Sequence, residues 1–354
     1  MKNTDTLNLK SDISHQSCDT SSQANNAPSQ KQLLSPGAER IILDCDTGHD
    51  DAVAILLAVG NPNIDLVGVT TVGGNAELDK VTYNSRAVLE EAEAFDVPVH
   101  RGCAQPLLTP LRPAAAVHGE TGLDGVELPE PIHVPLQKDH AVRWIIDTVM
   151  EADFHTITLV CTGPLTNLAL AARMEPAIIK RVKRVVLMGG GVHEANSTPV
   201  AEFNIWTDPD AAKIVFDAPW DVTMVGLDTT HQALCTPEVQ ERIVKNGGEI
   251  GAFMSGLMDF FRLAYQENQD FQDPPVHDPC TIAYLIDPTV IKTRRCPVAI
   301  ENQPGLTFGQ TVADMRGPED PSSHTQVTLD LDFNKFWGIV EDAIVAINNK
   351  KRAN

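Results

Sequence analysis

Four carboxylates lie within eight residues at the end of the first long apolar run: Asp44, Asp46, Asp50 and Asp51. The first pair ends a strand-like run, and the second pair opens a helix-like run after Gly48. Packed together, these acids would repel one another without a counter-charge, and carboxylate oxygens are the ligands that Ca²⁺ and Mg²⁺ prefer. Acids in a first helical turn can instead complement the helix dipole, but that explains only the second pair. The pattern therefore favours a divalent-metal site.

An acid and an amide flank an aromatic residue in the segment Glu202-Phe203-Asn204. If this segment is extended, positions 202 and 204 share one face, opposite Phe203. Side by side, the two groups can accept from and donate to adjacent hydroxyls, as a sugar site requires. The alternative is a loop whose polar groups bond to their own backbone.

A histidine and an aspartate, His277 and Asp278, precede Pro279 and an apolar run. Asp278 fits a helix N-cap with Pro279 at the first helical position. It also fits a further metal ligand, with His277 as a proton donor or stacking group. A second histidine, His118, lies in a glycine-rich loop that we expect to be mobile rather than part of the core.

Two glycine-rich segments, Gly73-Gly74 and residues 189–191, resemble phosphate-binding loops only superficially. Neither matches the glycine spacing of the known nucleotide-binding motifs, and no lysine is placed to reach a phosphate. Close approach of the backbone to a neutral ligand, or a plain turn at a strand end, is the favoured interpretation.

Short apolar runs alternate with helical segments from Glu39 onward. Strands are expected at 41–46, 64–72, 97–100, 156–161, 184–188 and 221–227, and helices at 51–60, 77–94, 139–152, 164–173, 176–182, 208–217, 236–247 and 249–268. This alternation predicts an α/β fold with an open, mainly parallel, Rossmann-like central sheet flanked by helices. A small antiparallel addition near the C-terminus, from strands at 296–301, 307–313 and 324–331, and a last helix at 334–348 complete the prediction.

Candidate site residues follow the predicted strands repeatedly. They are Asp46 after the first strand, Asn75 after the second, Thr162 after the fourth and Met188 with its glycines at the fifth, while Asp228 is expected to end the sixth. In open α/β sheets, ligands bind beyond the carboxyl ends of the strands. We therefore expect these residues to gather around one site.

The composition excludes several classes of partner. The 354 residues carry a formal net charge of −21, so neither nucleic acid nor an anionic membrane is an expected partner. No apolar run approaches the ~20 residues that cross a bilayer, which predicts a soluble protein. Seven cysteines without a CxxC pair look like reduced thiols of a cytoplasmic protein, and zinc is disfavoured. Residues 1–37 are predicted to be a disordered polar tail and residues 38–354 a single domain.

Taken together, these segments closely resemble the inosine-uridine preferring nucleoside hydrolases. The family's DxDxGxDDAxA motif is found here at residues 44–54, with Thr47 where many members have proline. Further matches follow in family order from about residue 40 to the C-terminus: Gly73-Gly74-Asn75, residues 162–167, Met188 with residues 189–191, residues 202–204 and His277-Asp278.

The resemblance implies a set of residue roles around a tightly bound Ca²⁺ and a small-molecule ribonucleoside. The implied metal ligands are Asp46, Asp51, Asp278 and the backbone carbonyl of Thr162, with Asp46 also the general base. The residues implied to bind ribose are Asp50, Asn75, Met188, Asn196, Glu202 and Asn204. On the base side are His118, Phe203, Phe261, Tyr265 and His277, the last assisting the departing base. Relatives of this kind form homodimers or homotetramers.

The implied reaction is hydrolysis of the N-ribosidic bond to ribose and free base, in nucleoside salvage. It builds oxocarbenium-like positive charge on the sugar, which a carboxylate-lined pocket stabilises. Purine and pyrimidine ribonucleosides are both expected substrates, inosine and uridine foremost. Phe261 stands where some members have tyrosine, and it can equally be an ordinary buried partner of Tyr265.

Two alternatives belong to other classes of protein. A haloacid-dehalogenase-type phosphatase also begins with a strand ending in DxD, but Gly48 occupies the position where that family has Thr or Val. A catalytically inactive, calcium-dependent nucleoside-binding protein would keep the site without turnover, although every expected acid is present.

Overall fold

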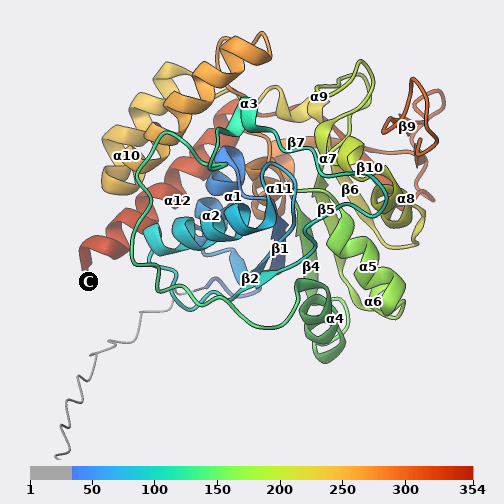
Figure 1. Cartoon of the computed structure of the whole chain (residues 1–354), viewed down its shortest axis with the longest axis horizontal. Coiled ribbons are helices and arrows are strands. Elements are labelled where there is room, and N and C mark those ends of the chain that lie inside the picture. The colour runs from blue at the N-terminus through green and yellow to red at the C-terminus, as the bar shows by residue number, and fades with distance from the viewer. Residues whose placement is uncertain (1–33, 354) are drawn as a thin grey trace, which may run out of the picture.

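The computed structural model describes residues 34–353, which form an eight-stranded sheet, a two-stranded sheet and surrounding helices (Figure 1). The order in the large sheet is β3-β2-β1-β4-β5-β6-β10-β7. Every neighbouring pair is parallel except β10 and β7. These strands are β1 (Glu39–Cys45), β2 (Ile64–Thr71), β3 (Val99–Arg101), β4 (Ile157–Cys161), β5 (Arg184–Met188), β6 (Val222–Val225), β7 (Ile291–Arg295) and β10 (Thr325–Leu331). The predicted mainly parallel α/β fold is confirmed.

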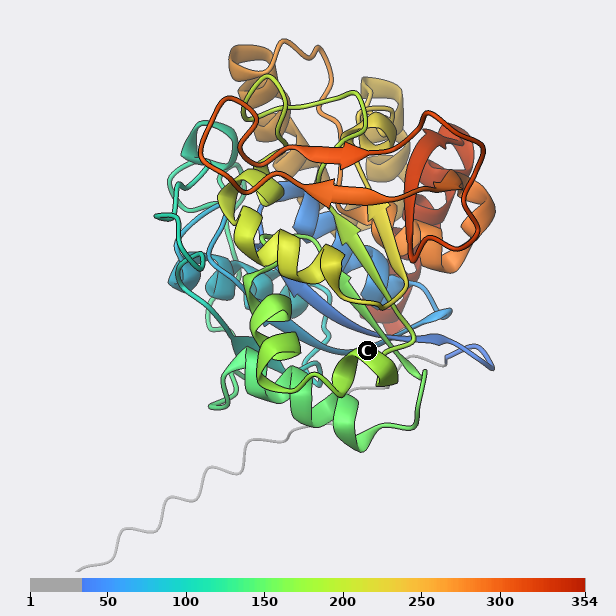
Figure 2. The same cartoon turned by 90° about the vertical axis from the view of Figure 1, so that its right-hand side faces the viewer.

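Helices cover both faces of this sheet (Figures 1 and 2). One face packs against α1 (His49–Gly60), α2 (Leu78–Glu91), α10 (Pro237–Asn268), α11 (Pro279–Ile286) and α12 (Phe333–Ala353). The other packs against α4 (Ala141–Glu151), α5 (Thr166–Met174), α6 (Ile178–Arg181) and α8 (Pro209–Asp217). Each face of the sheet therefore has its own hydrophobic core. Successive side chains of β1 alternate between them, with Ile41 and Leu43 in the first core and Ile42 in the second.

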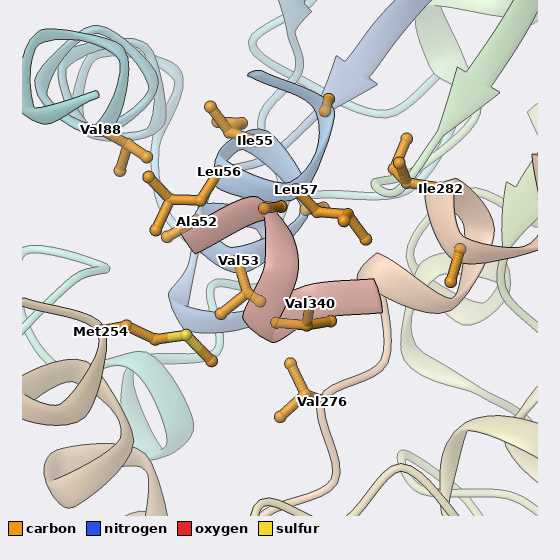
Figure 3. Packing of buried hydrophobic residues seen from close by; sticks show 14 of the residues in the cluster. Ala52, Val53, Ile55, Leu56, Leu57, Val88, Met254, Val276, Ile282 and Val340 are labelled. Carbon is orange, nitrogen blue, oxygen red and sulfur yellow. The ribbon is translucent and has the colours of Figure 1, made fainter. Parts of the chain in front are cut away.

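Helix α1 is buried on nearly all sides. Its residues 52–57 are fully buried, as expected for a helix that is apolar all round. It packs against α12, α11 and α2, and Figure 3 shows Val53 and Leu56 among side chains of these neighbours, including Val340 and Val88. This packing fixes the first turn of α1, which carries Asp50 and Asp51.

The C-terminal part differs from the prediction in detail. The predicted small antiparallel addition is confirmed as β8 (Val298–Ile300) paired with β9 (Thr311–Ala313), facing the viewer in Figure 2. The segment 324–331, however, lies in the main sheet as β10, parallel to β6, and β7 was not predicted. Parallel pairing is decided by contacts between segments about a hundred residues apart, which local patterns do not record.

One boundary also differs from the prediction. The sixth strand ends at Val225, and Asp228 lies in the short helix α9 (Leu227–Thr230) instead of at the strand end. The predicted break between helices at 236–247 and 249–268 is confirmed, because α10 is kinked at Gly248, whose φ of 55° suits glycine. No helix among residues 34–353 combines the length and apolarity needed to cross a membrane. The predicted disordered tail lies almost entirely outside the described residues.

Candidate active site

A cavity of about 400 Å³ opens at the carboxyl ends of the strands. It is lined by thirteen of the fifteen residues that sequence reasoning placed in the site: Asp50, Asn75, His118, Thr162, Met188, Asn196, Glu202, Phe203, Asn204, Phe261, Tyr265, His277 and Asp278. The other two, Asp46 and Asp51, are fully buried, and both are bonded to Asn75. The structure thus gathers the whole predicted set around one pocket.

Three carboxylates from two helices meet at this pocket. Oxygens of Asp50, Asp51 and Asp278 all lie within 4.8 Å of one another. Asp51 accepts hydrogen bonds from the backbone N–H of Gly48 at 2.9 Å and from the hydroxyl of Thr162 at 2.7 Å. Asp278 takes the N-cap position of α11 but makes no side-chain cap bond, so its oxygens remain available to the cluster.

Asp46 is not one of these three mutually close carboxylates, and two glycines approach it closely. Its Oδ2 accepts a hydrogen bond from the backbone N–H of Asn75 at 2.6 Å, whereas its Oδ1 is buried without a partner among the described residues. A Cβ at Gly74 would overlap Oδ2, and one at Gly163 would lie 2.7 Å from Oδ1. These glycines are therefore required for close approach to a carboxylate.

The pKa values of these acids are raised, so each carboxyl group is harder to ionise than in water, and a nearby cation would reverse this effect. Burial, followed by the charge of Asp51, raises the pKa of Asp50 to about 7. Burial and the neighbouring carboxylates raise the pKa of Asp46 and of Asp278 well above the usual range. A divalent ion with oxygen ligands would remove this penalty and occupy the unpartnered Oδ1. The residues present therefore fit a bound metal ion.

Glu202 and Asn204 are positioned by a helix instead of a strand. The expectation that they share one face of an extended segment is wrong, because α7 (Phe203–Thr207) begins here with Glu202 as its N-cap. The Glu202 carboxylate accepts from the backbone N–H of Asn204 and of Gly190, both at 2.9 Å. Burial raises the pKa of Glu202 to about 7. The Asn204 amide donates to the carbonyl oxygen of Thr162 at 2.8 Å.

Asp228, to which the sequence analysis assigned no role, holds the loop that carries Asn196. Asp228 accepts hydrogen bonds from the backbone N–H groups of Val192, at 2.6 Å, and of His193, at 3.0 Å. Asn196 in turn accepts from the N–H of Phe203 at 2.9 Å. The loop is therefore tied to α9 at one end and to the start of α7 at the other.

Aromatic and imidazole groups also line the pocket. His277 lies between two hydroxyls, with Thr230 Oγ1 2.8 Å from its Nδ1 and Tyr265 Oη 2.7 Å from its Nε2. Burial lowers the pKa of His277 well below its ordinary value, so the ring is neutral. Phe261 packs edge-on against Tyr265 with ring centroids 4.8 Å apart.

His118 is not in an open loop as expected. It ends a short helix, α3 (Ala115–His118), with only 5 % of its surface exposed. Its Nδ1 accepts a hydrogen bond from the backbone N–H of His49 at 3.3 Å, and its ring stacks on Phe261. The glycines that suggested mobility instead allow the chain to turn tightly after the helix, since Gly119 has a φ of 78°.

Seven further lining residues were not predicted: Arg112, Pro113, Ala114, Val117, Ser197, Trp206 and Gln269. Most lie in loops or at a helix end, away from any strand tip, so the rule that located the other residues does not reach them. For Trp206, the i, i+3 spacing from Phe203 on one helix was a usable signal.

Comparisons with known proteins identify the family of the chain. A sequence model of the family described as inosine-uridine preferring nucleoside hydrolase matches residues 41–338. The chain is 53% identical over 310 residues to the nucleoside hydrolase of that description from Leishmania major, covering 88% of this chain and 98% of that protein. It is 44% identical over 305 residues to a pyrimidine-specific ribonucleoside hydrolase of Escherichia coli strain SE11, covering 86% and 96%.

A solved structure shows the same fold. The purine-preferring ribonucleoside hydrolase from Gardnerella vaginalis superposes with a TM-score of 0.81 at 31% identity, covering 87% of this chain and 99% of that one. The family model spans most of the chain, and the relatives are matched almost over their whole length. The chain therefore belongs to the inosine-uridine preferring nucleoside hydrolase family and is a hydrolase that acts on ribonucleosides.

Proposed function

We propose that this protein hydrolyses the N-glycosidic bond of both purine and pyrimidine ribonucleosides, releasing ribose and the free base, with Ca²⁺ as cofactor. The observation that carries the proposal is the convergence of three buried carboxylates at a pocket that is also lined by amide side chains and by aromatic and histidine rings. The breadth of substrate is supported by the matched relatives, which include a pyrimidine-specific and a purine-preferring enzyme.

Asp46, Asp51, Asp278 and the carbonyl oxygen of Thr162 would hold the ion. The Thr162 carbonyl already accepts one hydrogen bond, from Asn204, and keeps a second lone pair for a ligand. When bound, Ca²⁺ supplies positive charge that makes a nearby water easier to deprotonate and orders the vicinal hydroxyls of ribose. Calcium suits this donor set because every ligand is an oxygen.

Asp46 is the proposed general base. Its Oδ1 has no protein donor and would face the ion, while Oδ2, held by the N–H of Asn75, keeps a second lone pair that can receive the proton of the attacking water. The glycines at positions 74 and 163 leave room for that carboxylate but for little else. Attack by the water oxygen on C1′ then breaks the bond to the base.

The sugar wall would stabilise positive charge on the ribose as the bond breaks. Asp50 and Glu202 line the pocket as carboxylates, and Asn75, Asn196 and Asn204 offer amide groups to the hydroxyls. Because Glu202, Asn196 and Asn204 are already held by hydrogen bonds to the backbone, little reorganisation of these three groups is needed in the transition state.

The aromatic wall would receive the base, flanked by His118, Phe203 and Phe261. The departing nitrogen needs a proton or a polar donor, and the neutral His277 and Tyr265 form a hydrogen-bonded pair that can provide one. The same pair can serve purines and pyrimidines, because a hydroxyl can donate a hydrogen bond to a base of either size.

The cellular setting is also a proposal. Six cysteines in residues 34–353 are free thiols, five of them buried, which supports a reducing cytoplasm and a role in nucleoside salvage. We further propose a homodimer or homotetramer, which light scattering coupled to gel filtration would measure.

The decisive experiment is a ribose-release assay on purified protein with inosine and uridine, before and after exhaustive chelation. We expect turnover of both substrates, loss on chelation, and recovery on adding Ca²⁺. Binding of inosine without release of hypoxanthine would support the inactive nucleoside-binding alternative instead. The phosphatase alternative is contradicted by the family to which the chain belongs.

A further inference from the structure

The loop between β5 and α7, residues 189–202, carries Asn196 to the pocket and contains no helix or extended strand. Four consecutive backbone N–H groups in this loop, those of residues 190–193, each donate to a side-chain oxygen from elsewhere in the fold. Because an irregular segment takes its position from the partners of its backbone groups, those side chains decide where the loop lies. They come from three different elements: Glu202 at the start of α7, Thr311 in β9 and Asp228 in α9.

The hydroxyl of Thr311 holds both polar backbone groups of Gly191. It accepts a hydrogen bond from the Gly191 N–H at 3.0 Å and donates one to the Gly191 carbonyl oxygen at 2.6 Å, which a single hydroxyl can do. Thr311 is the first residue of β9 and is only 5 % exposed. Its methyl group packs closely on Gly190, where a Cβ would lie 2.6 Å from Thr311 Cγ2. The small antiparallel sheet thus delivers one side chain to the loop that carries Asn196.

Asp228 holds the next two peptide groups of the loop. Its two oxygens accept separately, Oδ2 from the N–H of Val192 at 2.6 Å and Oδ1 from the N–H of His193 at 3.0 Å. The helix that carries Asp228 is itself anchored to the main sheet, because the Gln232 amide donates to the carbonyl oxygens of Asp228 and of Leu329 in β10. The loop is therefore tied at this point to a fixed part of the fold.

Asn196 lies three residues beyond this clamped segment. Its Oδ1 accepts from the N–H of Phe203, and its amide NH2 group has no hydrogen-bond partner among residues 34–353, so it can donate to a ligand oxygen. Glu202 depends less on the loop, because the N–H groups of Asn204 and Ile205 in its own helix also hold its carboxylate. Loosening residues 190–193 should therefore act mainly on Asn196.

We propose that Thr311 and Asp228 are positioning residues for the reaction, which hold residues 190–193 so that the Asn196 amide can donate to a ribose oxygen. The inference rests on the proposed ribose-binding role of Asn196. Neither Thr311 nor Asp228 is among the residues that line the cavity, so neither is expected to touch the substrate. The small sheet of β8 and β9 then has a role in the active site through this one hydroxyl.

The test compares Thr311→Val with Thr311→Ser, in the full-length protein with Ca²⁺ present. Valine keeps the volume of threonine without its hydrogen bonds, and kcat/KM should fall about tenfold. The fall should be equal for inosine and uridine, because both carry the same sugar. Serine keeps the hydroxyl and should restore most of the activity. The matched control is Thr158→Val, a fully buried threonine near the amino end of β4 that donates to Glu39; it should lose stability and keep kcat/KM unchanged.

A double-mutant cycle shows whether the loss passes through Asn196. If Thr311 acts by placing Asn196, Thr311→Val should lower kcat/KM less than about twofold in an Asn196→Ala background, because coupled residues are not additive. Asp228→Asn replaces one acceptor oxygen with an NH2 group and should behave in the same way. If melting curves show that Thr311→Val does not fold, Asp228→Asn takes its place in the cycle. A tenfold loss in both backgrounds would show a merely structural role and overturn the inference.

The remaining outcomes separate this inference from the proposed function. If the wild-type protein does not release ribose from inosine or uridine, the proposed function is wrong and the inference falls with it. If the wild type is active and Asn196→Ala keeps near-normal kcat/KM, the ribose role of Asn196 and the inference are wrong while hydrolysis stands. If Asn196→Ala is impaired but Thr311→Val and Asp228→Asn are not, only the inference is wrong.

Discussion

The Nε2 atom of His277 lies 2.7 Å from the hydroxyl oxygen of Tyr265, and its Nδ1 lies 2.8 Å from the hydroxyl of Thr230. Each ring nitrogen therefore faces a group that can both donate and accept. Burial keeps His277 neutral. A proton can therefore shift along the hydrogen bonds that join Thr230, His277 and Tyr265 without leaving a buried charge. Its end at Tyr265 lines the pocket.

The Tyr265 hydroxyl is expected to contribute directly to turnover. Tyr265→Phe removes one oxygen and keeps the ring that packs on Phe261. We expect kcat to fall about 10²-fold, the lower range for loss of a general acid, with little change in thermal stability. Steady-state kinetics with inosine and uridine measure this effect. A variant with near-normal kcat would show that the hydroxyl only orients His277.

His277→Ala should impair purine cleavage more than pyrimidine cleavage. A purine leaves with less help from its own exocyclic oxygen and depends more on a donor in the pocket. The measurement is the ratio of kcat for inosine to kcat for uridine in wild type and variant. Equal losses for both substrates would assign His277 a structural role.

Asp46→Asn should abolish turnover while preserving the fold. The amide keeps the volume between Gly74 and Gly163 but cannot accept the proton of the attacking water. In metal-free protein the substitution removes one of several mutually repelling buried acids, so the melting temperature should stay equal or rise. Calorimetry after chelation measures stability, and ribose release measures turnover. Retention of near-normal rate would contradict the base role.

Gly163→Ala should damage the site without damaging the core. The added Cβ would lie 2.7 Å from Asp46 Oδ1, which forces the carboxylate to move. We expect at least a tenfold fall in kcat/KM. The matched control is Gly338→Ala in α12, where a Cβ meets nothing within 4 Å; it should leave activity unchanged and stabilise the protein by about 0.5–1 kcal/mol. Equal activity of the two variants would argue against this close approach of Gly163 to Asp46.

Metal-free protein should become less stable as pH rises from about 4 to about 7. The folded-state pKa of Asp50 is about 7, above its unfolded value near 4, so the folded state binds more protons in that interval. The contribution of Asp50 to stability is therefore greatest below about pH 4. Between the unfolded and the folded pKa, each rise of one pH unit lowers the free energy of unfolding by about 1.4 kcal/mol. Bound Ca²⁺ should flatten this dependence. Urea midpoints from pH 5 to 8, with and without Ca²⁺, test it; a flat profile without metal would contradict the prediction.

Local sequence patterns were sufficient for the framework. Near-continuous apolar strands such as residues 157–161 have no solvated face, and so predict a parallel sheet covered on both sides. In such a sheet the carboxyl ends of the strands meet at one edge, which is why polar residues after several strands could be assigned to one pocket. Asp46, Asp50 and Asp51 were the simplest case, because one strand–helix junction brings them together.

Tertiary structure alone decided the features that depend on distant segments. The parallel pairing of β10 with β6, the burial of His118 and the hydroxyl partner of His277 on α9 each join residues tens to a hundred positions apart. So does the seating of Arg112 on Trp206, from a loop without periodicity. The sequence determined which acids meet at the strand ends, because backbone geometry acts over a few residues. The pocket's far walls were set by packing between segments whose proximity no local pattern encodes.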